Sequence, residues 1–360
     1  MSAFDPADPA GPLFRDAVSS RVDLFFDQIA RDLQGLAPES SSLVNDLVDL
    51  GRRFTAGGKR LRPAFCYWGH VAVAGQTGDR LPLLDATVGF ELLHVAALIH
   101  DDLIDDSDTR RGMPAAHRQL EAMHRDAGGS GDSAAFGRSG AIILGDLMTA
   151  WSTQCFAAAG LPARAFERSR WVLDAVRTEV NLGQFLDLAA EGGLSGDDLL
   201  GTAEQVVEYK TARYTVIRPL QFGAALAGAR QGLLDQLAAV GSAVGRAFQF
   251  RDDLLGVFGD EELTGKPAGD DLRENKRTVL VVDALRHVPE LADYLGRPLT
   301  GQQLDDARAL LIDSGSVARL NARIDADSAT ALELLAGLDI TPEGREALES
   351  LIHVSVDRQF

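Results

Sequence analysis

Apolar residues recur at intervals of three and four positions along almost the whole chain. One such series runs through Val88, Leu92, Leu93, Ala96 and Leu103, a spacing that places the side chains on one face of an α-helix. Sustained alternation with a period of two, which would indicate strands, does not occur in the sequence. Glycine and proline interrupt the apolar series at several points. The pattern predicts an all-α fold of ten or more helices.

The same pattern bears on how the chain is organised. No low-complexity tract divides it, so residues 1–360 are expected to form a single domain. Residues 1–15 are expected to be a loose N-terminal tail. Residues 126–140 are rich in Gly, Ser and Asp and predict a mobile loop between two helices, which could act as a lid or be an inert insertion.

Composition narrows the classes of function. The 360 residues include 53 Asp+Glu and 35 Lys+Arg, a net charge of -18, which argues against a nucleic-acid-binding protein. The sequence contains no run of about 18 apolar residues and no signal-peptide pattern at its start, so a cytoplasmic protein without a transmembrane segment is expected. Cys66 and Cys155 lie in apolar stretches and are expected to be buried, without a role in the chemistry.

A first acidic cluster follows an apolar helical stretch. Asp101 and Asp105 are four residues apart, as are Asp102 and Asp106, so each pair is expected on one helix face about one turn apart. Like charges at this spacing repel each other unless a cation lies between them. Mg²⁺ is well suited because it binds a few carboxylates together with phosphate oxygens and water. The cluster therefore predicts a magnesium site, against the alternative of a solvated acidic helix end.

A second acidic cluster, Asp252-Asp253, has fewer acids at ligand spacing. The residue four positions after Asp252 is Gly256, and Asp260 lies about 12 Å further along a helix, too far to share an ion. Asp252 is therefore expected to be the main ligand of this cluster.

Basic residues in short polar or glycine-containing segments complete the candidate chemistry. Each segment alone could simply solvate a loop, but together they supply the guanidinium and ammonium groups that two diphosphates require. They are Lys59, Arg60, Arg62, Arg110, Arg111, Lys210 and Lys266.

The order of these motifs resembles the trans-isoprenyl diphosphate synthase (polyprenyl synthetase) family, and its last segments resemble actinobacterial geranylgeranyl diphosphate synthases. The motifs are GGKRLRP, LIHDDLIDDSDTRRGMPAAH, GDLMTAW, GQFLDL, KTA, FQFRDDLLGVFGD and GKPAGDDLRENKRT, between Gly57 and Thr278. The resemblance implies one large helical bundle around a central cavity, a homodimer, and two acidic clusters that face each other. It also implies three Mg²⁺ ions when substrate is bound.

Roles for individual residues come from the resemblance. It assigns catalytic positions to Asp101, Asp102, Asp105, Asp252, Lys210, Thr211 and Gln249, with metal ligation by Asp101, Asp105 and Asp252. Diphosphate binding falls to Lys59, Arg62, His94, Arg110, Arg111, Gln184 and Lys266. In the implied reaction, an allylic diphosphate ionises and isopentenyl diphosphate attacks the resulting cation. Gly256 departs from the family pattern, which usually has an aspartate there.

Product length is predicted from the helix below the first cluster. Ala97 lies one turn before Asp101 with Ala96 beside it, so bulky residues do not block a growing chain there. Phe90 is about 16 Å down and leaves room for about four five-carbon units, which favours geranylgeranyl diphosphate (C20). Met148 or Trp151 could form the floor instead.

Three alternatives stay open at this point. A farnesyl or longer-chain polyprenyl diphosphate synthase would carry the same motifs. A terpene cyclase shares the acidic site but lacks the isopentenyl pocket, and Lys59, Arg62 and Arg111 argue against it. A non-catalytic subunit is disfavoured because the chain keeps the acids and arginines that such subunits lose, namely Asp101, Asp102, Asp105, Asp252, Arg110 and Arg111.

Overall fold

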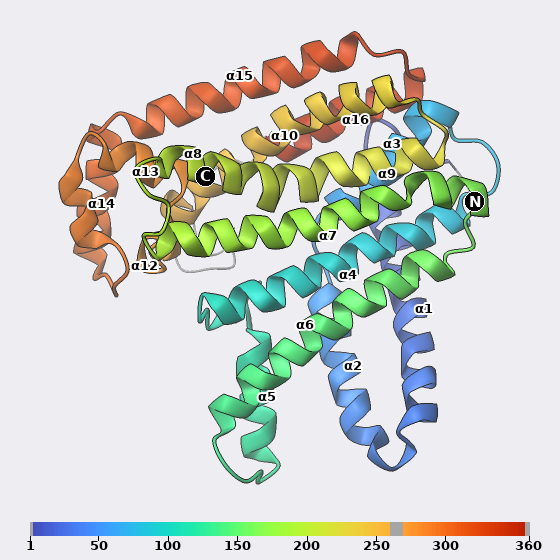
Figure 1. The fold of residues 1–360 in the computed structure, drawn as a ribbon, viewed down its shortest axis with the longest axis horizontal. Coiled ribbons are helices and arrows are strands. Elements are labelled where there is room, and N and C mark those ends of the chain that lie inside the picture. The colour runs from blue at the N-terminus through green and yellow to red at the C-terminus, as the bar shows by residue number, and fades with distance from the viewer. Residues whose placement is uncertain (1–2, 260–268, 357–360) are drawn as a thin grey trace.

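The computed structural model describes residues 3–259 and 269–356, and these residues form fifteen α-helices (Figure 1). The first half of the chain contains α1 (Pro12–Leu36), α2 (Ser41–Thr55), α3 (Leu61–Ala74), α4 (Leu81–Ile104), α5 (Ala116–Asp126), α6 (Ser133–Ala158) and α7 (Ala163–Glu191). The second half contains α8 (Leu199–Val206), α9 (Arg218–Leu226), α10 (Gln231–Phe258), α12 (Asp270–Arg273), α13 (Val279–Leu285), α14 (Gly301–Asp313), α15 (Ser316–Ala336) and α16 (Pro342–Val356). The all-α prediction is confirmed.

Three short helices of other types and one small ribbon complete the described fold. The 3-10 helices are η1 (Pro38–Ser40) and η3 (Pro289–Tyr294), and η2 (Val207–Ile217) is a π-helix. The strands β1 (Thr109–Arg110) and β2 (Met113–Pro114) pair antiparallel.

The long helices α4, α6 and α7 lie side by side across the molecule, with α10 and α15 above them in Figure 1. Helix α4 is apolar on nearly all sides, so it is buried in the bundle. By length and composition it could cross a membrane, but 72% of its most apolar window is buried within the fold, as expected of a core helix. The acids that follow this apolar run are thus carried to the end of a central helix.

From residue 3, where the described part of the chain starts, the N-terminal segment is packed, so the predicted loose tail is wrong for residues 3–15. Phe4 is 8% exposed, and its ring lies edge-on to those of Phe14 and Tyr67 at centroid distances of 5.1 and 5.2 Å. The indole nitrogen of Trp68 donates a hydrogen bond to the carbonyl of Pro9 (2.9 Å). Burial of one aromatic ring outweighs the polar composition around it.

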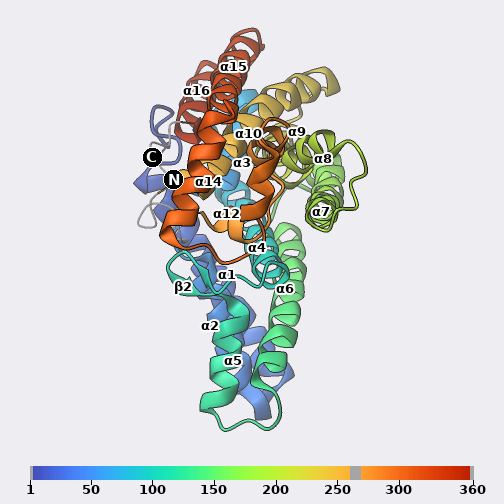
Figure 2. The same cartoon turned by 90° about the vertical axis from the view of Figure 1, so that its left-hand side faces the viewer.

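The predicted loop at residues 126–140 is also mostly wrong, because α6 already begins at Ser133. The side chain of Asp132 caps this helix by accepting a hydrogen bond from the amide of Ala134 (2.9 Å). Gly137 permits close helix packing, since a Cβ there would lie 2.3 Å from the carbonyl oxygen of His117 on α5. The connection that remains lies at the tip of the α5–α6 hairpin, away from α12 and the end of α4 in both views (Figures 1 and 2), which gives a lid role no support.

Candidate active site

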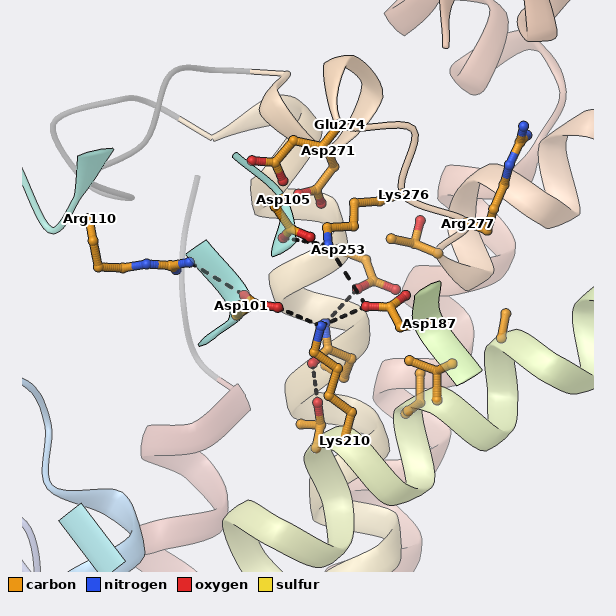
Figure 3. Close-up of a pocket in the computed structure, with 16 residues that line it drawn as sticks. Asp101, Asp105, Arg110, Asp187, Lys210, Asp253, Asp271, Glu274, Lys276 and Arg277 are labelled. Atoms are coloured by element: carbon orange, nitrogen blue, oxygen red, sulfur yellow. Dashed lines mark hydrogen bonds and ion pairs between the residues drawn. The ribbon is translucent and has the colours of Figure 1, made fainter. Parts of the chain in front are cut away.

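A cavity of about 260 Å³ lies between the end of α4, α7, η2, α10 and the segment around α12. Its described lining includes six acids and four bases, and in Figure 3 most of them surround one space while Arg277 points away from it. They are Asp101, Asp105, Asp187, Asp253, Asp271 and Glu274, with Arg110, Lys210, Lys276 and Arg277. Acids this close together need counter-charges when the site is empty.

The first acidic cluster lies where α4 ends. The amide of Asp105 donates to the carbonyl of Asp101 (2.9 Å), so the predicted one-turn spacing is kept and both side chains line the cavity. Asp102 is buried on another side and accepts a hydrogen bond from Nε of Arg110 (2.7 Å). Asp106 does not pair with Asp102 as predicted, because its backbone turns to φ 51° and its side chain is exposed.

A tight hairpin presents the two arginines that follow. Arg111 and Gly112 connect β1 to β2 and both have positive φ, 53° and 72°, as a two-residue turn between antiparallel strands requires. Arg110 on β1 reaches Asp101 (3.4 Å) in addition to Asp102. The hairpin therefore places Arg110 at the cavity and leaves Arg111 for the neighbouring cluster.

Two lysines compensate the acids of the cavity (Figure 3). Lys210 Nζ lies 2.9 Å from Oδ1 of Asp101 and 2.6 Å from Oδ2 of Asp187, and Gln184 donates a further hydrogen bond to Asp101 (3.0 Å). Lys276 Nζ lies 2.6 Å from Oδ2 of Asp105. Burial alone would raise the pKa of Asp101, but Lys210, Lys276 and Arg110 outweigh it and lower that pKa.

Glycines on two helices bring Lys210 into place. A Cβ at Gly183 on α7 would lie 2.4 Å from the backbone nitrogen of Lys210, and one at Gly245 on α10 would lie 2.3 Å from Cα of Ala212. The π-helix η2 is therefore in close backbone contact with both helices. It also carries Thr211, whose hydroxyl donates a hydrogen bond to Oε1 of Gln249. Thr211 and Gln249 therefore line the same cavity, and their catalytic role stays a prediction.

In the second acidic cluster, Asp253 faces the cavity. Its side chain is 2% exposed, and Nε2 of Gln249 donates to Oδ1 (2.7 Å) while Oδ2 has no hydrogen-bond partner. Burial raises the pKa of Asp253 well above its ordinary value. Asp252, the predicted main ligand, is half-buried and is not among the residues that line this cavity. Its metal role stays a prediction.

A second group of cationic and polar side chains surrounds His94. Its Nδ1 lies 2.8 Å from the hydroxyl of Tyr214, and its Nε2 lies 3.3 Å from Arg111. The guanidinium of Arg62 lies over the Tyr214 ring, 4.2 Å from its centroid. Burial, Arg62 and Arg111 lower the pKa of His94 well below its ordinary value, so the ring is neutral. Lys59 is exposed at the turn before α3.

The apolar residues below Asp101 divide into two sets. Ala97 packs against a small cluster formed by Leu93, Val176, Val180 and Tyr214. Phe90 instead belongs to the main core, where it forms a three-ring cluster with Phe156 and Phe222, and Ala96, Met148 and Trp151 are buried in that core as well.

The donor set suits magnesium. Within residues 3–259 and 269–356, no three His, Cys, Asp or Glu side chains are arranged to hold an ion by themselves. Carboxylates line opposite walls of one cavity, and Oδ2 of Asp253 is buried without a partner. This fits an ion that takes one or two carboxylates and completes its shell with phosphate oxygens and water. Lys266, a predicted diphosphate ligand, lies outside the described residues.

Comparison with known proteins identifies the family of the chain. A sequence model of the Polyprenyl synthetase family matches residues 46–309. The chain is 32% identical over 303 residues to a geranylgeranyl diphosphate synthase of Methanosarcina mazei, with 83% of each chain covered. It is 31% identical over 311 residues to a (2E,6E)-farnesyl diphosphate synthase of Mycobacterium bovis, which covers 84% of this chain and 80% of that one.

A solved structure shares the whole architecture. The geranylgeranyl pyrophosphate synthase of Corynebacterium glutamicum, complexed with isoprenyl diphosphate and magnesium, superposes with a TM-score of 0.90 at 38% identity and covers 96% of this chain and 99% of that one. Fold and site together define a helical prenyltransferase. The chain belongs to the polyprenyl synthetase family, and the resemblance drawn from its motifs is confirmed. It is an enzyme of the trans-prenyl diphosphate synthase type.

Proposed function

We propose that this enzyme condenses an allylic diphosphate with isopentenyl diphosphate and releases geranylgeranyl diphosphate as its main product, with three Mg²⁺ ions bound alongside the substrate. The observation that carries the proposal is the arrangement of Asp101, Asp105 and Asp253 around one cavity with Lys210 and Lys276 between them. A carboxylate set this dense binds an anion only through metals and the basic side chains among the acids.

Each group of side chains has a distinct task in this reaction. Asp101 and Asp105, with Asp252 of the second acidic cluster, would hold the magnesium, which as a Lewis acid stabilises the departing diphosphate. Lys210 and Lys276 would exchange their carboxylate partners for oxygens of the same diphosphate. Hydroxyl and amide oxygens of Thr211 and Gln249 border the cavity and can face a cationic carbon without capturing it.

Isopentenyl diphosphate would bind at the second cationic group, formed by Arg62, Arg111 and the neutral His94. Guanidinium groups bind diphosphate oxygens without a metal, and His94 would hold Arg111 in place by accepting its hydrogen bond. Lys59, on the adjacent turn, would add an ammonium. This second pocket separates a chain-elongating enzyme from a terpene cyclase, which uses a single diphosphate.

The C20 product follows from the depth of the apolar set below Asp101. Leu93 precedes Asp101 by eight residues, about 12 Å along the helix. Three extended five-carbon units occupy about 13 Å and four about 18 Å from carbon–carbon bond lengths. A C15 allylic substrate would therefore reach about the level of Leu93 and be elongated once to C20, whereas a C20 substrate would extend about 6 Å past it. This replaces Phe90 by Leu93 as the floor.

Incorporation of radiolabelled isopentenyl diphosphate, with products resolved by chain length, tests both the activity and the assignment of Leu93 as the floor of the cavity. We expect a C20 product that requires Mg²⁺, C15 or shorter from Ala97→Phe, and products beyond C20 from Leu93→Ala. Leu92→Ala and Phe90→Ala are matched controls, because both residues pack in the main core and their truncation should cost stability but leave product length unchanged. Longer products from Phe90→Ala would instead show that Phe90 limits the product length.

We further propose a cytoplasmic homodimer without a membrane span, in which residues 1–360 act as one domain. Helices α6 and α7 lie along one edge of the molecule in Figure 2. Their exposed apolar side chains support a contact with a second copy, because an uncovered patch of this kind is unusual on a monomer. These side chains are Ile142, Ile143, Leu182, Phe185 and Leu188. Light scattering of Phe185→Glu, expected to be monomeric, tests the interface.

A further inference from the structure

Position 256 lies one helical turn after Asp252 on α10, where glycine leaves the second cluster without an acid at ligand spacing. The space that a side chain would enter is already filled. A Cβ built on Gly256 would lie 2.0 Å from Oδ2 and 2.5 Å from Cγ of Asp271. The carboxylate of Asp271, which comes from α12, thus stands where a side chain at position 256 would begin.

Backbone contacts hold Asp271 in this place from both sides. The amide of Gly269 donates a hydrogen bond to the carbonyl of Gly256 (3.1 Å), which ties the start of α12 to α10. Gly269 has φ 77°, a conformation suited to glycine. After α12, the amide of Lys276 donates to the carbonyl of Asp271 (2.9 Å). The backbone position of Asp271 is therefore built into the fold.

A second observation points to a ligand at the same wall. Asp253 lines the cavity with Asp271 (Figure 3), and its Oδ2 is buried without a hydrogen-bond partner. A buried carboxylate oxygen left in this state is costly unless a cation or water completes it. Two carboxylates from different helices, α10 and α12, thus line the same cavity.

We propose that Asp271 supplies a carboxylate to the divalent cation held at the α10 wall, in place of the acid that position 256 lacks. The inference rests on the proposed function, since it concerns the same magnesium site. It also reverses a simple expectation: Gly256→Asp would not strengthen the site, because the new side chain would collide with Asp271. The acid can occupy position 256 only if Asp271 gives up its place.

The test measures metal binding without turnover. Melting temperature is followed against MgCl₂ concentration in the presence of inorganic pyrophosphate, and bound Mn²⁺ is counted by electron paramagnetic resonance. Asp271→Asn should raise the magnesium concentration for half-maximal stabilisation by about 10-fold or more. Asp270→Asn removes the same charge from the same turn outside the cavity lining and should change it by less than about 2-fold.

The second part of the experiment moves the acid from position 271 to position 256. Gly256→Asp alone should bind magnesium no better than wild type, whereas Gly256→Asp with Asp271→Gly should return to within about 3-fold of wild type. Equal magnesium dependence of Asp271→Asn and Asp270→Asn would overturn the inference, and this comparison decides even if the double variant does not fold. Should wild type itself fail to bind magnesium with pyrophosphate, the proposed function fails, and the role of Asp271 with it.

Discussion

Lys276 is expected to stabilise the empty site, and Lys276→Met tests this. Its Nζ lies 2.6 Å from Asp105, 3.1 Å from Glu191 and 3.8 Å from Asp187, and the side chain is 12% exposed. Burial alone would lower the pKa of Lys276, but the acids around it, Asp101 foremost, raise that pKa well above its ordinary value. Methionine keeps the length and the apolar stem but removes the charge.

Removing one partner of a buried ion pair costs about 3–5 kcal/mol, because the other charge is left uncompensated. In a large domain about 1 kcal/mol lowers Tm by about 2 °C. The metal-free variant should therefore melt roughly 6–10 °C below wild type. Magnesium can compensate the same carboxylates, so millimolar MgCl₂ should raise the Tm of Lys276→Met by more than it raises that of wild type.

The assay is differential scanning calorimetry of EDTA-treated protein with and without MgCl₂. Lys59→Met is the matched control, because it makes the same change at an exposed lysine and should shift Tm by no more than about 1–2 °C. The reasoning is refuted if Lys276→Met loses no more than Lys59→Met, or if magnesium stabilises wild type and variant equally.

Three further changes give distinct results. Asp101→Ala should lower kcat by about 10³-fold or more, measured as isopentenyl incorporation, because a ligand of the metal that stabilises the leaving group is lost. Tyr214→Phe should raise KM for isopentenyl diphosphate about 5- to 10-fold with little change in kcat, since the hydrogen bond to His94 is lost. Burial raises the pKa of Glu191 to about 7, so its contribution to stability, present below the unfolded value near 4.5, is lost as pH rises through 7. Glu191→Gln, melted without metal, should therefore gain Tm relative to wild type between pH 5 and pH 8.

The local sequence was sufficient to predict those site residues that lie together on one helix. Asp101 and Asp105 belong to a single helical turn, so their spacing along the chain is their spacing in space. Lys210 was found in the KTA motif, but its position depends on Gly183 and Gly245 in two other helices. Such a three-helix contact has no signature in any one segment.

Residues from the turn around α12 were missed for the same reason. Lys276 and Asp271 lie in a polar segment that reads as an ordinary loop, and they reach the cavity only because α12 is tied to α10. The one available signal was Gly256 itself, since a glycine inside a helix often marks a close approach of another element. The packing of the N-terminal segment had an even weaker signal in the sequence, because it depends on a single aromatic residue, Phe4.

The charges of the cavity explain why metal and diphosphate should bind together. With the site empty, Asp101 and Asp105 are satisfied by Lys210 and Lys276, so magnesium alone must compete with two buried ammonium groups. A diphosphate alone would meet more acids than bases along the described lining. When both arrive, each lysine exchanges a carboxylate for a phosphate oxygen and each carboxylate exchanges an ammonium for the metal. In this exchange Asp101, Asp105, Lys210 and Lys276 each keep a partner of opposite charge, which is how an acidic protein can bind a strongly anionic substrate.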